Sequence, residues 1–210
     1  MRLEQDDKIL FLGGLNTGAG RKLNDFTDIG RGFPMITAAA LDAKHPDLKL
    51  SFNNASSLNN NTQTMMESVD ELCIDLHPTV VVIFAGYQDA MLAEKQHAQG
   101  TLQEYSRFNR NLRQLISHIQ EKVTRRIILI EPFLLDIDSM SRALRSDLNQ
   151  KIQIVREIAR DTSCDFVALD GVMNELAIKN GACAYMEQDG LTYKPATHHI
   201  IAHRLLTHFE

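Results

Sequence analysis

The sequence lacks tryptophan altogether, and only 6% of its 210 residues are aromatic. Since aromatic faces are the usual platform on which bases and sugars stack, recognition by stacking is disfavoured. Positive charge is also scarce, with 22 Lys and Arg residues against 27 Asp and Glu residues and a net charge of −5. Nucleic acids require a basic face, so we expect no nucleic-acid partner.

Long apolar runs are missing as well. No stretch reaches the roughly 18 consecutive apolar residues that a membrane-spanning helix requires. The start of the chain, residues 1–7, is polar and acidic and has no signal-peptide pattern. We therefore expect no membrane partner and a cytoplasmic location.

Cysteine is infrequent: Cys73, Cys164 and Cys183 are odd in number, far apart and set in apolar stretches. This pattern favours buried free thiols in a reducing compartment over disulfides. No cluster of histidine, cysteine and carboxylate residues has metal-ligand spacing, so we expect neither a metal nor another cofactor.

The residues that are present indicate one α/β domain. With 44% apolar residues, the chain can bury a single large core over residues 1–210. Apolar runs of strand type occur at residues 8–12, 48–52, 80–85, 126–130 and 165–169. Helical periodicity is clearest over 101–122, where an apolar stripe runs from Leu102 to Ile119, and over 144–159; a closing helix is expected from Pro195.

Strands that are apolar on both faces and alternate with helices are typical of a parallel sheet covered on each side. The sequence therefore predicts a three-layer α/β/α sandwich with a five-stranded parallel sheet, of the flavodoxin-like kind. In such sheets, ligands bind beyond the carboxyl ends of the strands. The polar run over 53–64 is expected to form a loop over that cleft.

Four segments, in order along the chain, resemble the sequence blocks of the SGNH (GDSL-like) esterase and lipase family. The segments are Gly13-Gly14-Leu15 after the first strand, Asn53-Asn54-Ala55 after the second, Gly86-Tyr87-Gln88-Asp89 after the third, and Asp189-Gly190-Leu191-Thr192 before the last helix. The resemblance implies the SGNH-hydrolase fold over almost the whole chain. It also implies that the four segments meet at one edge of the sheet.

In that family, the first and last blocks carry the catalytic triad. Leu15 stands where the family has its nucleophilic serine, and Gly14 stands where it has the preceding acidic residue. Thr192 stands at the position of the histidine base, so only Asp189 of the triad is kept. Leucine has no lone pair with which to attack, and a threonine hydroxyl cannot accept a proton as imidazole does.

The two middle blocks carry the oxyanion hole of the family. Ala55 stands at the glycine that donates a backbone N–H, and Gln88 stands at the asparagine that donates a side-chain amide. Ala55 could still direct its N–H inward, whereas Gln88 moves its amide outward by one methylene. The resemblance implies a set of positions around any remaining ligand site: Gly14, Leu15, Asn53, Ala55, Gln88, Asp189 and Thr192.

A relocated nucleophile is the alternative for an active enzyme. Thr17, Ser56 and Ser57 are the candidate hydroxyls, and His198 and His199 are the candidate bases. A cap or packing role for His198 and a turn-stabilising role for the two serines are the more common explanations for residues in such positions.

These patterns favour a pseudo-hydrolase, a protein of the SGNH fold that has lost the hydrolytic centre and can bind a small acylated or sugar-like ligand in the former cleft. One alternative is an active esterase, lipase or deacylase with a rearranged catalytic site. Another is a scaffold or interaction subunit that uses the fold as a surface. No feature of the sequence specifies an oligomeric state.

Overall fold

The computed structural model describes residues 1–209, and its centre is a parallel sheet of five strands in the order β2-β1-β3-β4-β5. The strands are β1 (Lys8–Gly13), β2 (Ser51–Asn54), β3 (Val80–Phe84), β4 (Ile127–Ile130) and β5 (Asp165–Val167). Every neighbouring pair is parallel, and in the central pair Ile9 faces Val80. The predicted five-stranded parallel sheet is confirmed.

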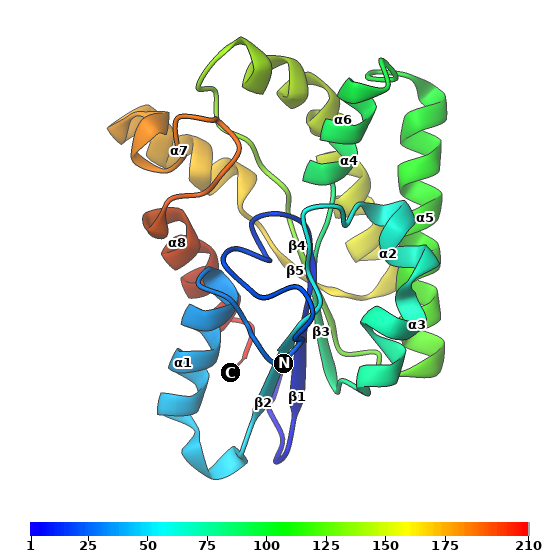
Figure 1. Ribbon diagram of the computed structural model, residues 1–210, viewed down its shortest axis with the longest axis vertical. Coiled ribbons are helices and arrows are strands. Elements are labelled where there is room, and N and C mark those ends of the chain that lie inside the picture. Colours follow the sequence, from blue (N-terminus) through cyan, green and yellow to red (C-terminus); the bar gives the residue numbers. More distant parts are fainter. Residues whose placement is uncertain (210) are drawn as a thin grey trace.

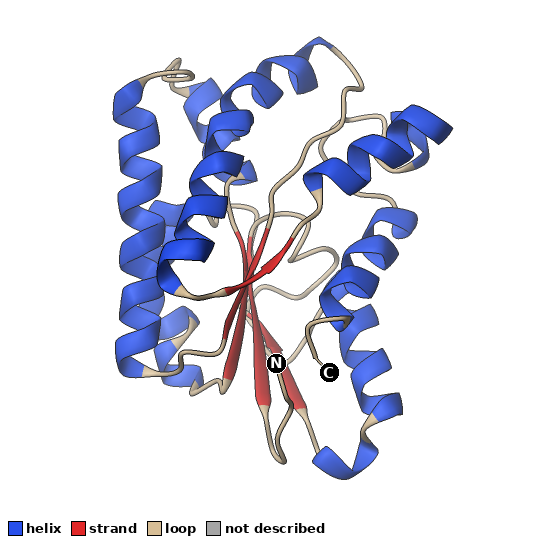
Figure 2. Ribbon diagram, turned by 180° about the vertical axis from the view of Figure 1, so that it is seen from behind, coloured by secondary structure: helices blue, strands red, loops and turns tan. Residues whose placement is uncertain are grey.

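Helices connect the strands and cover both faces of the sheet, which gives the predicted three layers (Figure 1, Figure 2). In chain order they are α1 (Phe33–Lys44), α2 (Thr62–Glu67), α3 (Val69–Leu72), α4 (Tyr87–Lys95), α5 (Leu102–Lys122), α6 (Ser139–Thr162), α7 (Asp170–Asn180) and α8 (Pro195–Leu206). Helices α1 and α8 pack together on one face, whereas α2, α3 and α5 lie on the other (Figure 1). Among residues 1–209, no helix is long and apolar enough to cross a membrane.

Alternate residues of the central strands point to opposite faces of the sheet and divide the core into two parts. Ile9 and Phe11 of β1 pack in the part that contains α1 and α8, while Leu10 and Leu12 pack in the part that contains α5. All residues of β3 are buried. This two-sided burial explains why the strands appear in the sequence as continuous apolar runs.

The start of the second strand differs from its expected position. Leu48 ends a short 3-10 turn (Pro46–Leu48), and Lys49 then adopts a left-handed conformation with φ of 51°. The strand therefore begins at Ser51 rather than at residue 48. The polar run expected to be a loop is also shorter than 53–64, because β2 includes its first two residues and α2 begins at Thr62.

Helix α5 covers the predicted range, but its first turn is not part of the buried stripe. Thr101 is the N-cap residue, and its Oγ1 accepts a hydrogen bond from the Glu104 N–H at 3.3 Å. Leu102 is 85% exposed, so its assignment to the apolar stripe was wrong. Helix α8 begins at Pro195 as predicted.

The three cysteines are free, and two of them match the expectation. Cys73 and Cys164 are buried thiols. Cys183 is exposed in a short 3-10 turn, Ala182–Ala184, so the prediction of burial was wrong for this residue.

Candidate functional site

The segments that follow β1 and β3 meet at the carboxyl edge of the sheet and enclose a small hollow. Its wall includes Gly14, Leu15 and Gln88 of the predicted site, together with Asn60 and Tyr193. The centre of a water molecule has only about 10 Å³ in which to move. This is room for about one water. Side chains therefore fill most of the space in which the cleft was expected.

Gln88 occupies the space above Gly14. A Cβ atom at position 14 would lie 2.3 Å from Cγ of Gln88, much closer than non-bonded carbon atoms approach. The side-chain amide nitrogen of Gln88 donates a hydrogen bond to the carbonyl oxygen of Leu58. The amide thus holds the loop before α2.

Three polar atoms without a hydrogen-bond partner in residues 1–209 belong to residues that line the hollow. They are Thr17 Oγ1, the Tyr87 hydroxyl and Gln88 Oε1. Burial raises the pKa of Tyr87, and the carboxylate of Asp189 raises it further, so the phenol remains protonated. The lining residues include no cationic side chain. Three residues that line the hollow, near the apolar side chain of Leu15, therefore each carry a neutral polar atom without a partner.

Asp189 is engaged within its own loop. Its Oδ1 accepts hydrogen bonds from the backbone N–H groups of Leu191 and Thr192, each at 2.8 Å, and its Oδ2 accepts one from Thr192 Oγ1 at 2.6 Å. Partial burial acts to raise the pKa of Asp189, but these hydrogen bonds outweigh it and the pKa is lowered. Asp189 is thus an acceptor for turn N–H groups, and Thr192 uses its hydroxyl to stabilise the same turn.

Asn16, which the sequence reasoning missed, fixes this loop beside the hollow. Its Nδ2 donates to the carbonyl of Leu191 at 3.0 Å, and its Oδ1 accepts from the N–H of Tyr193 at 3.0 Å. Because Asn16 follows Leu15 directly, these two bonds hold the loop of Asp189 and Thr192 next to the end of β1. Both hydrogen bonds join residues more than 170 positions apart, so no local pattern could have indicated them.

The second family block, Asn53-Asn54-Ala55, does not line the hollow. The N–H of Ala55 donates to the carbonyl of Phe11 at 3.0 Å, so the expectation that it could point inward was wrong. Ala55 contacts the hollow only through Asn60, whose Nδ2 donates to the Ala55 carbonyl at 2.9 Å. Asn53 donates to the carbonyl of Phe26 at 3.3 Å and does not line the hollow.

Among residues 1–209, no candidate hydroxyl for a relocated nucleophile is hydrogen-bonded to a candidate base. Ser56 is fully buried and donates to the carbonyl of Phe11, and Ser57 donates to Asn60 Oδ1 at 2.7 Å. Thr17 Oγ1 has no partner in residues 1–209. None of these hydroxyls is hydrogen-bonded to a histidine within the described part of the chain, so a nucleophile and base pair is not assembled.

The two candidate bases make other contacts. His198 Nδ1 accepts a hydrogen bond from the N–H of Phe33 at 3.2 Å, and its ring packs against Phe33 and Tyr193. Burial lowers the pKa of His198 to about 4, which keeps the ring neutral at physiological pH. His198 therefore has the expected packing role. His199 is exposed and stacks on His203 instead.

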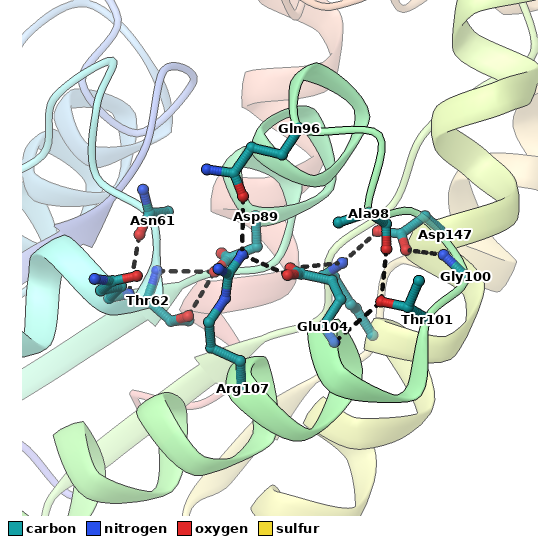
Figure 3. A network of polar contacts seen from close by, with 12 residues as sticks. Asn61, Thr62, Asp89, Gln96, Ala98, Gly100, Thr101, Glu104, Arg107 and Asp147 are labelled. Atoms are coloured by element: carbon teal, nitrogen blue, oxygen red, sulfur yellow. Dashed lines mark hydrogen bonds and ion pairs between the residues drawn. The ribbon is translucent and has the colours of Figure 1, made fainter.

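A buried ionic network lies next to the hollow and was not anticipated from the sequence (Figure 3). Asp89, which follows Gln88, accepts hydrogen bonds at its Oδ1 from the N–H and Oγ1 of Thr62 and thereby holds the first turn of α2. Beyond it, Lys151 on α6 forms ion pairs with Asp147 and with Glu104, the latter at 3.5 Å. The network ties α2, α4, α5 and α6 together around the segment that closes the hollow.

The comparisons with known proteins agree with this architecture. The sequence model of the GDSL-like lipase/acylhydrolase family matches residues 13–205. Among solved structures, the chain is similar to a variant of the acetyl xylan esterase Axe2 from Geobacillus stearothermophilus, with 25% identity, a TM-score of 0.84, and coverage of 99% of this chain and 96% of that one. It is also similar to a putative GDSL-like lipase from Parabacteroides merdae, with 21% identity, a TM-score of 0.87, and coverage of 98% and 96%.

A further similar structure is a catalytic mutant of the same acetylxylan esterase, with 23% identity, a TM-score of 0.87, and coverage of 100% of this chain and 98% of that chain. No curated protein matches the sequence. The match to the family model extends over almost the entire chain, and the five-stranded parallel sheet with helices agrees with the fold of the similar structures. The chain belongs to the GDSL-like lipase/acylhydrolase family.

Proposed function

We propose that this protein is a non-hydrolytic member of the GDSL-like family. The observation that carries the proposal is the pair of residues at the triad positions. Leu15 has no nucleophilic atom, and Thr192 uses its hydroxyl to donate to Asp189 at 2.6 Å rather than to accept a proton. Disabling a triad in this manner costs on the order of 10⁴–10⁶ in turnover.

The surroundings of the triad positions support the same function. The Ala55 N–H is hydrogen-bonded to the carbonyl of Phe11 and the Gln88 amide to the carbonyl of Leu58, so neither is free to stabilise an oxyanion. Losing one such donor costs roughly 10²–10³ in turnover. Because catalytic groups act as a unit, this loss is not multiplied with that of the triad.

Ligand binding at the old site is a second candidate function, favoured by one observation. Three residues that line the hollow each have one buried polar atom without a hydrogen-bond partner in residues 1–209. They are Thr17, Tyr87 and Gln88. These neutral groups suit a hydroxyl or carbonyl of an uncharged ligand, such as the acylated, sugar-like compounds suggested by the acetyl xylan esterase that this chain resembles. Such a ligand must displace Gln88 to enter, because the hollow has room for about one water.

We also propose that the protein works in a reducing compartment such as the cytoplasm. Burial raises the pKa of Cys73 to about 12 and also raises that of Cys164. Both thiols therefore remain un-ionised and unreactive, which suits structural cysteines that need no disulfide partner. The exposed thiol of Cys183 would be open to oxidation outside such a compartment.

The proposal is tested by measuring hydrolysis of p-nitrophenyl acetate and of acetylated xylo-oligosaccharides by the purified protein. We expect a rate that is linear in substrate concentration and equal to that of an unrelated protein with similar surface nucleophiles. Thr17→Ala, Ser56→Ala and Ser57→Ala serve as matched variants, since each removes a candidate hydroxyl. Saturable turnover that one of these variants abolishes would establish a rearranged esterase site and overturn the proposal.

Binding is measured separately, by titrating acetylated xylo-oligosaccharides into the wild type and Gln88→Ala in a calorimeter. Removing the Gln88 side chain should enlarge the hollow and strengthen any binding there. If neither protein binds, the old site has no such ligand, and a scaffold role becomes the better description of a non-hydrolytic protein.

A further inference from the structure

Helix α8 carries two exposed histidines on one face, away from the hollow. His199 and His203 are four residues apart, so their side chains project from the same side of the helix. Their rings are stacked, with centroids 6.4 Å apart and planes inclined by 17°. His198, in contrast, points into the protein and is hydrogen-bonded to the N–H of Phe33.

Two imidazoles in this arrangement are a chelating pair. A late transition-metal ion binds a ring nitrogen at about 2.0–2.1 Å, as zinc does. Small rotations of both exposed side chains can therefore bring one nitrogen of each ring to the same ion. Once the first imidazole has bound, the second is held nearby by the helix and binds as an intramolecular ligand.

We propose that His199 and His203 form a surface site for a divalent late transition-metal ion, such as Ni²⁺ or Cu²⁺, with water completing the coordination. Imidazole suits Ni²⁺, Cu²⁺ and Zn²⁺, and affinity generally rises through this series to Cu²⁺. Ca²⁺ and Mg²⁺ prefer oxygen ligands and should not bind.

The surroundings set the strength of this site. Among residues 1–209, no group of three histidine, cysteine or carboxylate side chains is arranged to hold a metal ion, so the two histidines act alone. Lys44 of α1 lines a surface depression together with His203, and its positive charge opposes a cation there. A site with two protein ligands and a nearby cation binds reversibly and exchanges its metal with solution.

The site is tested on the full chain, prepared without a histidine tag, by calorimetric titration with Ni²⁺ at neutral pH. We expect one Ni²⁺ per chain, and a loss of affinity of about 10–100-fold in His199→Ala and in His203→Ala. His118→Ala removes a lone histidine from the surface of α5 and is the matched control, which should bind as the wild type does. Titration with Mg²⁺ should give no heat of binding.

A positional variant separates geometry from histidine content. Exchanging Ala196 and His199 (A196H together with H199A) keeps the composition and charge but puts the first imidazole seven residues from His203, two turns of the helix away. This variant should bind Ni²⁺ as weakly as His203→Ala. Wild-type affinity in the exchanged variant, or no Ni²⁺ binding by the wild type, would overturn the inference. Both residues are exposed, so circular dichroism should show an unchanged fold in every variant.

Discussion

Replacing Lys151 by methionine probes the buried ionic network beside the hollow (Figure 3). The Lys151 side chain is 0% exposed, and its Nζ forms ion pairs with Asp147 and with Glu104. The ammonium also lies 5.4 Å from the ring centroid of Tyr105. Methionine keeps much of the apolar stem but removes the charge, so the substitution tests the electrostatic contribution rather than the packing.

The expected loss of stability depends on the contacts that Glu104 and Asp147 keep when the charge of Lys151 is removed. Glu104 keeps an ion pair with Arg107, whereas Asp147 keeps a hydrogen bond from the Gly100 N–H at 3.1 Å and its contact with the Tyr105 hydroxyl, but no cation among residues 1–209. Asp147 is then a buried carboxylate without a cation. Breaking a buried ion pair in this way costs about 3–5 kcal/mol of the free energy of unfolding. This is a large share of the roughly 5–15 kcal/mol that stabilises a typical domain.

Urea unfolding, followed by circular dichroism, measures the effect. With a typical m-value of about 2–3 kcal/mol/M, the midpoint of Lys151→Met should fall by about 1–2.5 M. Adding Asp147→Asn removes the stranded charge and keeps an acceptor for Gly100, so the double variant should recover to within about 1–2 kcal/mol of the wild type. A Lys151→Met midpoint equal to the wild type, or a double variant less stable than Lys151→Met alone, would refute the assignment of Lys151 as the compensating charge.

Three further predictions concern the site and the neighbouring Asp89. Burial raises the pKa of Asp89 despite the hydrogen bonds from Thr62. The folded protein therefore retains a proton that the unfolded chain releases. The free energy of unfolding should decline as the pH rises from about 4 through the pKa of Asp89 in the folded protein. Asp89→Asn should flatten this decline in urea unfolding measured at several pH values, and an unchanged slope would contradict the buried-proton argument. Gly14→Asp alone should cost about 1–3 kcal/mol, because its Cβ displaces Gln88. Combined with Leu15→Ser, Gln88→Asn and Thr192→His, it should give measurable esterase activity only when the serine and histidine are both present, as an assay of each subset would show.

The fold could be predicted from the sequence because its main determinant is local. A run such as Val80–Phe84 is apolar on both faces, and that pattern specifies a strand buried between two layers of helices. The second strand was misplaced because Leu48 and Leu50 look like strand residues in the sequence. The left-handed Lys49 between them ends the 3-10 turn instead, and a single lysine gives no signal of that conformation.

The site was predictable as a location but not as a set of contacts. The positions of Gly14, Leu15 and Gln88 at the carboxyl ends of β1 and β3 follow from the order of strands and loops. The bonds of Ala55 to Phe11 and of Gln88 to Leu58 depend on how separate segments are packed. A family pattern gives the residue at each position, but it does not give the direction of an N–H group or an amide.

The ionic network shows the same limit for charged residues. Asp147 and Lys151 are four residues apart on α6, a spacing that usually indicates an exposed pair on the surface of a helix. They are buried because α4 and α5 pack against that face of α6. Burial of this face depends on tertiary packing, and the charged residues themselves give the opposite signal.

Residues at the positions of the family blocks form two neighbouring pairs, Gly14 with Gln88 and Asp189 with Thr192. The space that a side chain at Gly14 would need holds Gln88, and Gln88 in turn bonds to the loop before α2. Thr192 donates a hydrogen bond to the carboxylate of Asp189. The proposed non-hydrolytic function requires such local pairing, because each buried polar group without a catalytic partner must find another or lower the stability of the fold. Leu15→Ser alone supplies a hydroxyl without a base, so we expect catalysis only when Thr192→His is present in the same protein.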